Sequence, residues 1–169
     1  MDRIEYFRKL LNSFSNNKWQ IVNGNILAQT PNYPYIEMFI INYSPDFHSQ
    51  SVEVVEKENK TLVERNTKTH NATLQLNCRH KSLIESAALA NELFKIINYV
   101  KRETINNNGF GIKEMSNIKS LNDFEGGKWN YCYSFDVEIS FDVIEERTIE
   151  TIETVKTNIK NKQEVIRNE

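Results

Sequence analysis

The sequence predicts an α+β fold: a mainly antiparallel sheet with two helices packed on one face, a long C-terminal strand and an extended arm. The first observation behind this prediction is an alternation of apolar and polar side chains over residues 131–143. The apolar odd positions are Tyr131, Tyr133, Phe135, Val137, Ile139, Phe141 and Val143. A period of two is typical of a strand with one buried and one wet face, whereas a helix would scatter these side chains around its circumference. The second observation is the order of the expected elements, which is a helix, several strands, a long helix and two more strands.

The alternating segment lies in an expected strand over residues 129–146. Such a strand would span roughly 55 Å at about 3.3 Å per residue, whereas a usual strand has only ~5–6 residues. We therefore expect it either to bend sharply or to run past its own domain. For the chain of 169 residues, we expect a single α+β domain over residues 1–147, followed by a C-terminal arm and flexible tail over residues 148–169.

The N-terminal part begins with an expected amphipathic helix over residues 2–15, because apolar side chains recur there at three- and four-residue steps. Asn23-Gly24-Asn25 between the apolar runs 19–22 and 26–28 predicts a hairpin turn. Residues 35–43 are apolar nearly throughout, which predicts a central strand covered on both faces.

The middle of the chain is more polar. We expect a loop over residues 44–50, then a hairpin with arms 51–56 and 61–64. Residues 71–79 alternate as a strand, and residues 61–71 could continue that strand.

The second expected helix covers residues 82–102 and begins with a capping box at Ser82 and Glu85. The run Asn106-Asn107-Asn108-Gly109 predicts its end. A strand over 111–121 and a turn over 122–127 lead into the long strand. After it, a Thr-Ile-Glu repeat of period three over residues 146–155 fits an extended arm or a short helix.

The composition of the chain argues against several classes of function. The net charge of −2 gives no general attraction to nucleic acid, and no apolar run approaches the ~20 residues that span a bilayer. The N-terminal residues are too charged for a secretory signal, so we expect assembly in the cytoplasm and no membrane partner. The two cysteines, Cys78 and Cys132, are expected to be buried free thiols.

The wet face of the long strand carries a row of carboxylates that includes Asp136, Glu138 and Asp142. Paired carboxylates can serve acid–base or metal chemistry, which would make the chain a small metal-dependent enzyme. A second interpretation is a solvated face balanced by Lys60, Arg65, Lys68 or Arg79 on a neighbouring strand. A third is an acidic face turned toward a channel, where it would repel DNA phosphates and let DNA slide past.

Other candidate chemistry is sparse. His48, His70 and His80 are spaced as surface or loop histidines rather than metal ligands, and no Ser-His-Asp arrangement is visible. We therefore expect no enzyme activity and no cofactor. The best contact candidates are Tyr33 with Tyr35 and the arm, although ordinary packing at the end of the sheet would also explain the tyrosines.

Three segments resemble the C-terminal part of the phage neck or tail terminator family. They are Tyr133-Ser134-Phe135-Asp136-Val137, Phe141-Asp142-Val143 and Glu146-Arg147-Thr148-Ile149-Glu150-Thr151-Ile152-Glu153. Upstream, Tyr33-Pro34-Tyr35-Ile36 resembles the entry to an early strand of that family. The resemblance covers roughly residues 3–155, and it departs from the family at Asn130-Tyr131-Cys132, where basic residues would be expected.

The resemblance implies a structural virion protein that forms a ring, commonly a hexamer, at the head-proximal end of a phage tail tube. Such a ring ends tube growth and offers a docking surface to the head or its connector. The implied partners are other copies of the chain and the tube protein, with the sheath and connector proteins as further candidates, and without sequence-specific binding of nucleic acid. The subunit-contact residues expected on this basis are Tyr33, Tyr35, Arg147, Ile149, Ile152 and Val155. A head–tail connector or stopper protein of the same particle is the alternative.

Overall fold

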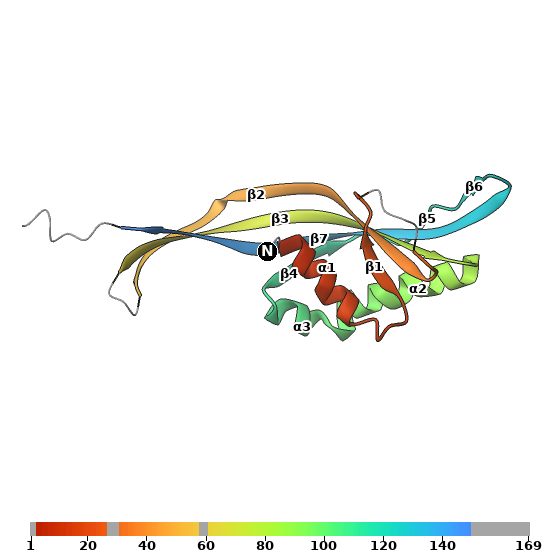
Figure 1. Cartoon of the computed structure of the whole chain (residues 1–169), viewed down its shortest axis with the longest axis horizontal. Coiled ribbons are helices and arrows are strands. Elements are labelled where there is room, and N and C mark those ends of the chain that lie inside the picture. Colours follow the sequence, from red (N-terminus) through yellow and green to blue (C-terminus); the bar gives the residue numbers. More distant parts are fainter. Residues whose placement is uncertain (1–2, 27–30, 58–60, 150–169) are drawn as a thin grey trace, which may run out of the picture. The chain divides into compact units, whose positions relative to one another are not determined.

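The computed structural model describes residues 3–26, 31–57 and 61–149. Its elements in chain order are α1 (Arg3–Ser13), β1 (Gln20–Asn23), β2 (Tyr35–Glu56), β3 (Leu62–His80), α2 (Leu83–Lys95), the π-helical turn η1 (Ile96–Val100), α3 (Arg102–Asn107), β4 (Phe110–Met115), β5 (Lys119–Ser120), β6 (Asp123–Glu125) and β7 (Lys128–Thr148). The described chain is therefore mainly sheet with some helices, which confirms the predicted mixture of the two (Figure 1).

The strands follow the order β1-β2-β3-β7-β4, with β5 and β6 also paired to β7. The pairings of β4, β5 and β6 with β7 are antiparallel, whereas β1 pairs with β2 in parallel. Of the strands in the described chain, β7 therefore has the most neighbours, and the expected long strand lies at the centre of the sheet's pairing.

The chain divides into two compact units. The first, which we call the core unit, comprises Met1–Asp46 and Thr69–Asp142. The second, which we call the ribbon unit, comprises Phe47–Lys68 and Val143–Glu169. Parts of β2, β3 and β7 lie in each unit, and all the described helices lie in the core unit.

Aromatic side chains join the helices of the core unit to its strands. Phe7 of α1 packs on Phe110 of β4 with ring centroids 4.9 Å apart. Phe94 of α2 meets the edge of Phe135 of β7 at 5.3 Å. Phe7, Phe110 and Phe135 are almost completely buried. Since rings of this size contribute large apolar areas, these contacts are a principal source of core stability.

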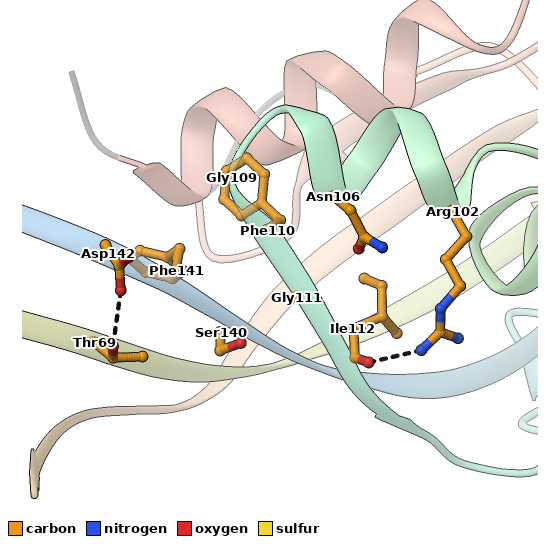
Figure 2. A pocket seen from close by; sticks show the side chains of 10 residues that line it. All are labelled: Thr69, Arg102, Asn106, Gly109, Phe110, Gly111, Ile112, Ser140, Phe141 and Asp142. Atoms are coloured by element: carbon orange, nitrogen blue, oxygen red, sulfur yellow. Dashed lines mark hydrogen bonds between the residues drawn. The ribbon is translucent and has the colours of Figure 1, made fainter. Parts of the chain in front are cut away.

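Helix α3 leads into β4, and its Arg102 side chain reaches the backbone of that strand (Figure 2). The Arg102 guanidinium donates to the carbonyl oxygen of Ile112 at 3.0 Å, so a backbone acceptor of the edge strand already has a partner. Gly109 lies between α3 and β4 with φ +79°, a conformation that a glycine adopts without steric cost. This edge of the sheet is thereby protected against pairing with another strand.

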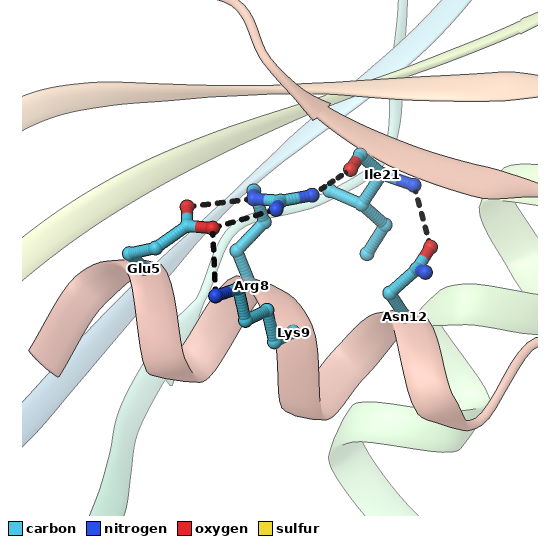
Figure 3. Close-up of polar contacts among 5 residues, drawn as sticks. All are labelled: Glu5, Arg8, Lys9, Asn12 and Ile21. Atoms are coloured by element: carbon cyan, nitrogen blue, oxygen red, sulfur yellow. Dashed lines mark hydrogen bonds and ion pairs between the residues drawn. The ribbon is translucent and has the colours of Figure 1, made fainter. Parts of the chain in front are cut away.

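Helix α1 is attached to β1 by polar contacts as well as by its apolar face (Figure 3). Asn12 Oδ1 accepts from the N–H of Ile21 at 2.9 Å, and the Arg8 guanidinium donates to the carbonyl oxygen of the same residue. The Arg8 side chain also pairs with Glu5 at 2.6 Å, and this hydrogen bond lowers the pKa of the Glu5 carboxyl. The expected apolar stripe is confirmed, because Ile4, Phe7 and Leu11 are buried.

Three expectations for the N-terminal half are wrong. Residues 35–43 do form a strand, but it is not covered on both faces, because Ile41 and Tyr43 are 58% and 49% exposed. The Asn23-Gly24-Asn25 turn does not start a hairpin: β1 pairs in parallel with β2, and Ile26 lies outside any strand. The chain instead follows β2 after β1, since the N–H of Gly24 donates to Met38 O and Asn25 Oδ1 accepts from the N–H of Ile40. The loop expected over residues 44–50 is part of β2, which continues without a break from Tyr35 to Glu56.

The helix expected over residues 82–102 is instead a succession of α2, η1 and α3. Its start is as predicted, since the Ser82 hydroxyl accepts from the N–H of Glu85. The interruption comes at Lys101, which leaves helical geometry and donates its N–H to the carbonyl of Ile96, five residues back. No helix among the described residues is long and apolar enough to cross a membrane.

Candidate functional site

The polar face of β7 in the core unit carries Asp136, Glu138 and Asp142. The predicted alternation is confirmed here, because Phe135, Val137, Ile139 and Phe141 are buried while the three acidic residues are partly or fully exposed. The same face includes Thr73 of β3, Glu114 of β4 and Ser116, which line a hollow of about 190 Å³ together with Asp136 and Glu138. This face of the core unit therefore concentrates carboxylates and hydroxyls.

The start of β7 departs from the predicted alternation. Cys132 and Ser134 are buried there, whereas Tyr131 and Tyr133 are only half-buried. Helix α2 is one reason, because the Ser86 hydroxyl donates to the carbonyl oxygen of Tyr131 at 3.1 Å. The wet face of β7 in the core unit therefore begins at Asp136.

Cations balance the carboxylate row unevenly. Lys113 lies 3.8 Å from Glu138, whereas Asp142 accepts from the Thr69 hydroxyl at 2.8 Å. Arg79 pairs with Glu37 at 2.7 Å and is not near the row. Within the described residues, Asp136 and Asp142 form no ion pair. The balancing expected from a neighbouring strand thus fails for these two carboxylates, and Lys60 lies outside the described residues.

The expected balancing does occur in the ribbon unit. Glu146 accepts from Lys57 at 2.7 Å and from Arg65 at 3.1 Å, and Lys68 pairs with Glu145 at 2.8 Å. The hydrogen bonds from Lys57 and then Arg65 lower the pKa of Glu146. Cations therefore pair with the carboxylates of β7 in the ribbon unit, whereas in the core unit Asp136 and Asp142 have no ion pair among the described residues.

The described residues offer no metal centre: no group of three His, Cys, Asp or Glu side chains among them could hold an ion. His70 Nδ1 shares a hydrogen bond with Tyr43 Oη at 2.8 Å, and His80 lies 2.8 Å from Glu85. The side chain of His48 lies outside the described residues. The three histidines thus have no common site in the described structure.

The pocket of Figure 2 has a volume of about 440 Å³ and was not anticipated from the sequence. It lies between α3, β4 and β7 of the core unit, with Arg102 and Asn106 on one wall and Ser140 and Asp142 on another. Because Arg102 is bound to Ile112 O and Asn98 Oδ1, and Asp142 to Thr69, its charged groups already have partners. The only signal for it in the sequence was the Gly109-x-Gly111 pair.

A comparison with known families indicates the class of protein. A family model described as phage neck terminator protein matches residues 4–164. The chain belongs to the phage neck terminator family. Among curated proteins, none matches the chain significantly. The family makes the protein a structural component of the virion at the neck of the phage tail.

Two of the contact residues expected for a neck terminator, Tyr33 and Tyr35, stack with ring centroids 5.4 Å apart. Tyr35 is only 4% exposed, and its burial, followed by the nearby Glu37 carboxylate, raises its pKa to about 12. Tyr33 is 38% exposed. Tyr35 is thus part of the packing of the terminator subunit, and Tyr33 is the ring of this pair that another chain could reach.

The arm expected in the terminator begins in the ribbon unit. Arg147 Nη2 pairs with Glu64 at 2.7 Å, and the N–H of Ile149 donates to Leu62 O at 2.9 Å, so the chain stays against β3 as far as residue 149. Ile152 and Val155 lie outside the described residues. Residues 147–149 at the start of the expected arm therefore continue the pairing of β7 with β3 in their own subunit.

Ion pairs dominate the ribbon unit of the terminator. Side chains of its strands form cross-strand ion pairs, and among the side chains that the structure describes here Val63 is the single apolar one that is buried. Arg65 pairs with Glu53 as well as Glu146, at 3.2 and 3.0 Å. Exposed ion pairs of this kind contribute little to stability because solvent screens them, and this sheet has little of the apolar burial that stabilises the core unit.

Proposed function

We propose that this neck terminator protein caps the head-proximal end of the tail tube as a ring of identical subunits, with a hexamer as the expected form. In this role it ends tube growth and offers the surface on which the head or its connector docks. The observation that carries the proposal is a sheet that extends into a unit whose described side chains form no core of their own. Such a unit needs neighbours, because a few strands exposed on both faces are marginally stable alone.

The acidic face of the core unit supports a position beside the path of DNA. Asp136 and Asp142 carry charge without a cationic partner among the described residues, and this charge would repel phosphates rather than bind them. A channel lined by Asp136, Glu138 and Asp142 lets DNA pass without adhering. The proposal includes no sequence-specific recognition, since nothing in this role reads bases.

The partners in this proposal are other copies of the chain, the tail tube protein and, on the opposite side, the connector proteins of the head. In a contractile tail the sheath is a further partner. Tyr33, Arg147 and Ile149 are the described residues that we assign to contacts between subunits, and Ile152 and Val155 extend that set along the arm. Assembly takes place in the host cytoplasm before the head joins the tail.

Electron microscopy of particles made with and without the protein tests the proposed function. Without it, we expect tail tubes of irregular and excessive length, with heads that fail to join. Expression of the intact chain from a plasmid restores tubes of uniform length. Uniform tubes that lack only the head would instead indicate the alternative role of a connector or stopper, and joined particles of normal length would refute both roles.

A further inference from the structure

The ribbon unit has two strand edges that no other strand of the described chain covers. β1 pairs with β2 only over Tyr35–Met38, so the outer edge of β2 is open from residue 50 to residue 56. β4 pairs with β7 only as far as Phe141, so the outer edge of β7 is open from Val143 to Thr148. Open edges of this length are templates for pairing with another chain.

The hydrogen bonds to β3 show which backbone groups of β2 and β7 point outward at these edges. The N–H of Ile149 points to Leu62 of β3, and alternate residues of an antiparallel strand point to opposite sides. Ile144, Glu146 and Thr148 therefore present their N–H and C=O groups to the open edge of β7. In the same way, the N–H of Lys57 points to Thr61, so the alternate residues Val52, Val54 and Glu56 face the open edge of β2.

The side chains at these edges favour pairing with a strand of another chain. The strand segment 50–56 contains no lysine, arginine or proline, which are the residues that protect exposed edges. Val52 and Val54 are 57% and 60% exposed, and Ile144 is 58% exposed. Valine and isoleucine are strong strand formers, so both edges combine open backbone with exposed apolar side chains. The edge of β4 in the core unit, by contrast, has Arg102 on its carbonyl.

The direction of the strands restricts the partner. Within the ribbon unit, β3 is antiparallel to both neighbouring strands. Lys68 of β3 contacts Glu145 of β7, and the earlier residue Leu62 contacts the later residue Ile149. Glu53 with Arg65 and Lys57 with Thr61 show the same reversal for β2. β2 and β7 therefore run in the same direction at opposite edges of one sheet. Two unlike edges of this kind form a head-to-tail contact, which closes into a ring under rotation.

We propose that the open edge of β7 in one subunit pairs in parallel with the open edge of β2 in the next subunit of the ring. A rotation by a small fraction of a turn cannot reverse a strand, so a cyclic ring permits only the parallel arrangement. The pairing extends the ribbon sheets into one continuous sheet around the ring. This inference rests on the proposed function, because it assumes a cyclic assembly of identical subunits.

Disulfide capture tests both the partner and the direction. The pair Arg65–Glu53 and the pair Lys68–Glu145 lie on opposite faces of the ribbon, so Val52 and Val54 share a face with Val143 and Glu145. Double variants combine Val52→Cys or Val54→Cys with Val143→Cys, Glu145→Cys or Arg147→Cys. Within one subunit β3 separates these positions by about 10 Å, which is beyond disulfide reach, so any bond formed joins two subunits.

The expected result is a ladder of cross-linked oligomers on a non-reducing gel, up to the size of the closed ring. If the strands are parallel, the β7 position that captures the Val52→Cys thiol should lie two residues before the one that captures the Val54→Cys thiol. The matched control is Val54→Cys with Ile144→Cys, which lie on opposite faces and should not cross-link. The inference would be overturned if the β7 cysteine that cross-links to Val54→Cys had a lower residue number than the one that cross-links to Val52→Cys. Equal cross-linking of the control variant would also overturn it.

A proline in the edge gives an independent test. Val54→Pro removes an N–H that points away from β3, so the subunit should fold while its open edge is blocked. Val54→Thr keeps the N–H and serves as the control. We expect light scattering to show rings for Val54→Thr and single subunits for Val54→Pro, with equal circular dichroism. Rings of unchanged size and stability from Val54→Pro would overturn the inference, and a proline variant that fails to fold leaves the decision to the cross-links.

The inference and the proposed function can fail separately. A ring at the end of the tube without β7–β2 cross-links would refute the strand pairing and leave the terminator role intact. Cross-linked rings in particles whose tubes are of normal length without the protein would refute the capping role and leave the pairing intact. Each outcome therefore assigns the failure to one of the two statements.

Discussion

Phe110 of β4 lies directly opposite Phe141 of β7, and the two rings meet edge to face with centroids 5.9 Å apart. Phe110 also contacts Phe7, so this pair connects α1 to the sheet. We expect Phe141→Ala to lower the free energy of unfolding by about 3–5 kcal/mol, through lost burial and the cavity left behind. Urea denaturation followed by circular dichroism measures it. The neighbouring Asp142→Ala faces solvent and should change stability by less than about 0.5 kcal/mol.

Shortening the arm should weaken ring formation while the subunit stays folded. A chain that ends at Glu146 loses the Arg147–Glu64 ion pair and the hydrogen bond from Ile149 to Leu62, together with the rest of the arm. We expect it to elute from a sizing column as single subunits with unchanged circular dichroism. A chain that ends at Val155 is the control and should form rings. If the shorter chain forms the same ring, the arm does not hold neighbours together.

Acidification should loosen the ribbon unit before it unfolds the core. The pKa of Glu146 is held below its ordinary value of 4.5 by hydrogen bonds from Lys57 and Arg65. A lowered pKa means that the carboxylate stabilises the fold at higher pH and that this contribution is lost as pH falls through the lowered value. The ribbon unit should therefore begin to loosen below about pH 4.5, where the unfolded chain starts to take up this proton. Hydrogen exchange of β7 amides after residue 143 provides the measurement, and Glu146→Gln should flatten the pH dependence.

The two cysteines should react slowly with thiol reagents in the native protein. Both are buried, and burial is the main cause that raises the pKa of the Cys78 and Cys132 thiols. Since the thiolate is the reactive form, neither side chain offers an accessible nucleophile at neutral pH. A disulfide-exchange dye should label both residues within seconds in denaturant and only on the time scale of unfolding without it. Rapid labelling of one native thiol would contradict this arrangement.

Reversing the charge of the core unit's polar face should impair DNA passage and spare assembly. Asp142→Lys places a cation on the face that we assign to the channel, where it would hold phosphates during ejection. We expect particles with normal tubes and joined heads whose DNA ejection, followed by dye fluorescence, is slower by about tenfold or more. Asp142→Asn isolates the loss of the negative charge and should have a smaller effect. Equal ejection rates for Asp142→Lys and the parent would remove this residue from the channel.

The elements with strong local signals were predictable. The alternation along β7 from Phe135 to Phe141, the Ser82 and Glu85 cap and the stripe on α1 each express one periodicity or one capping rule, and each is confirmed. The family followed from the Tyr133–Val137 and Glu146–Glu153 segments. Their signal was specific because the segments are long and combine aromatic, acidic and β-branched residues at fixed positions.

The misses arose where long-range pairing decides the structure. β1 has a good hairpin turn after it, yet its hydrogen bonds go to β2 in parallel, which no local signal reports. Residues 44–50 look like a loop because they are polar and contain Pro45, although an edge strand tolerates both. The pocket at Arg102 depends on how α3 meets β4 and β7, and the sequence showed only its two glycines.

The small number of buried apolar side chains around Val63 has a consequence for when subunits assemble. A sheet held by exposed charge pairs gains little burial in a lone subunit, so a neighbour would add stability that the lone subunit lacks. If the protein caps the tube as we propose, the end of a finished tube would bring the first neighbours together. Closure of the ring would then be coupled to the completion of the tube and not to the abundance of the protein.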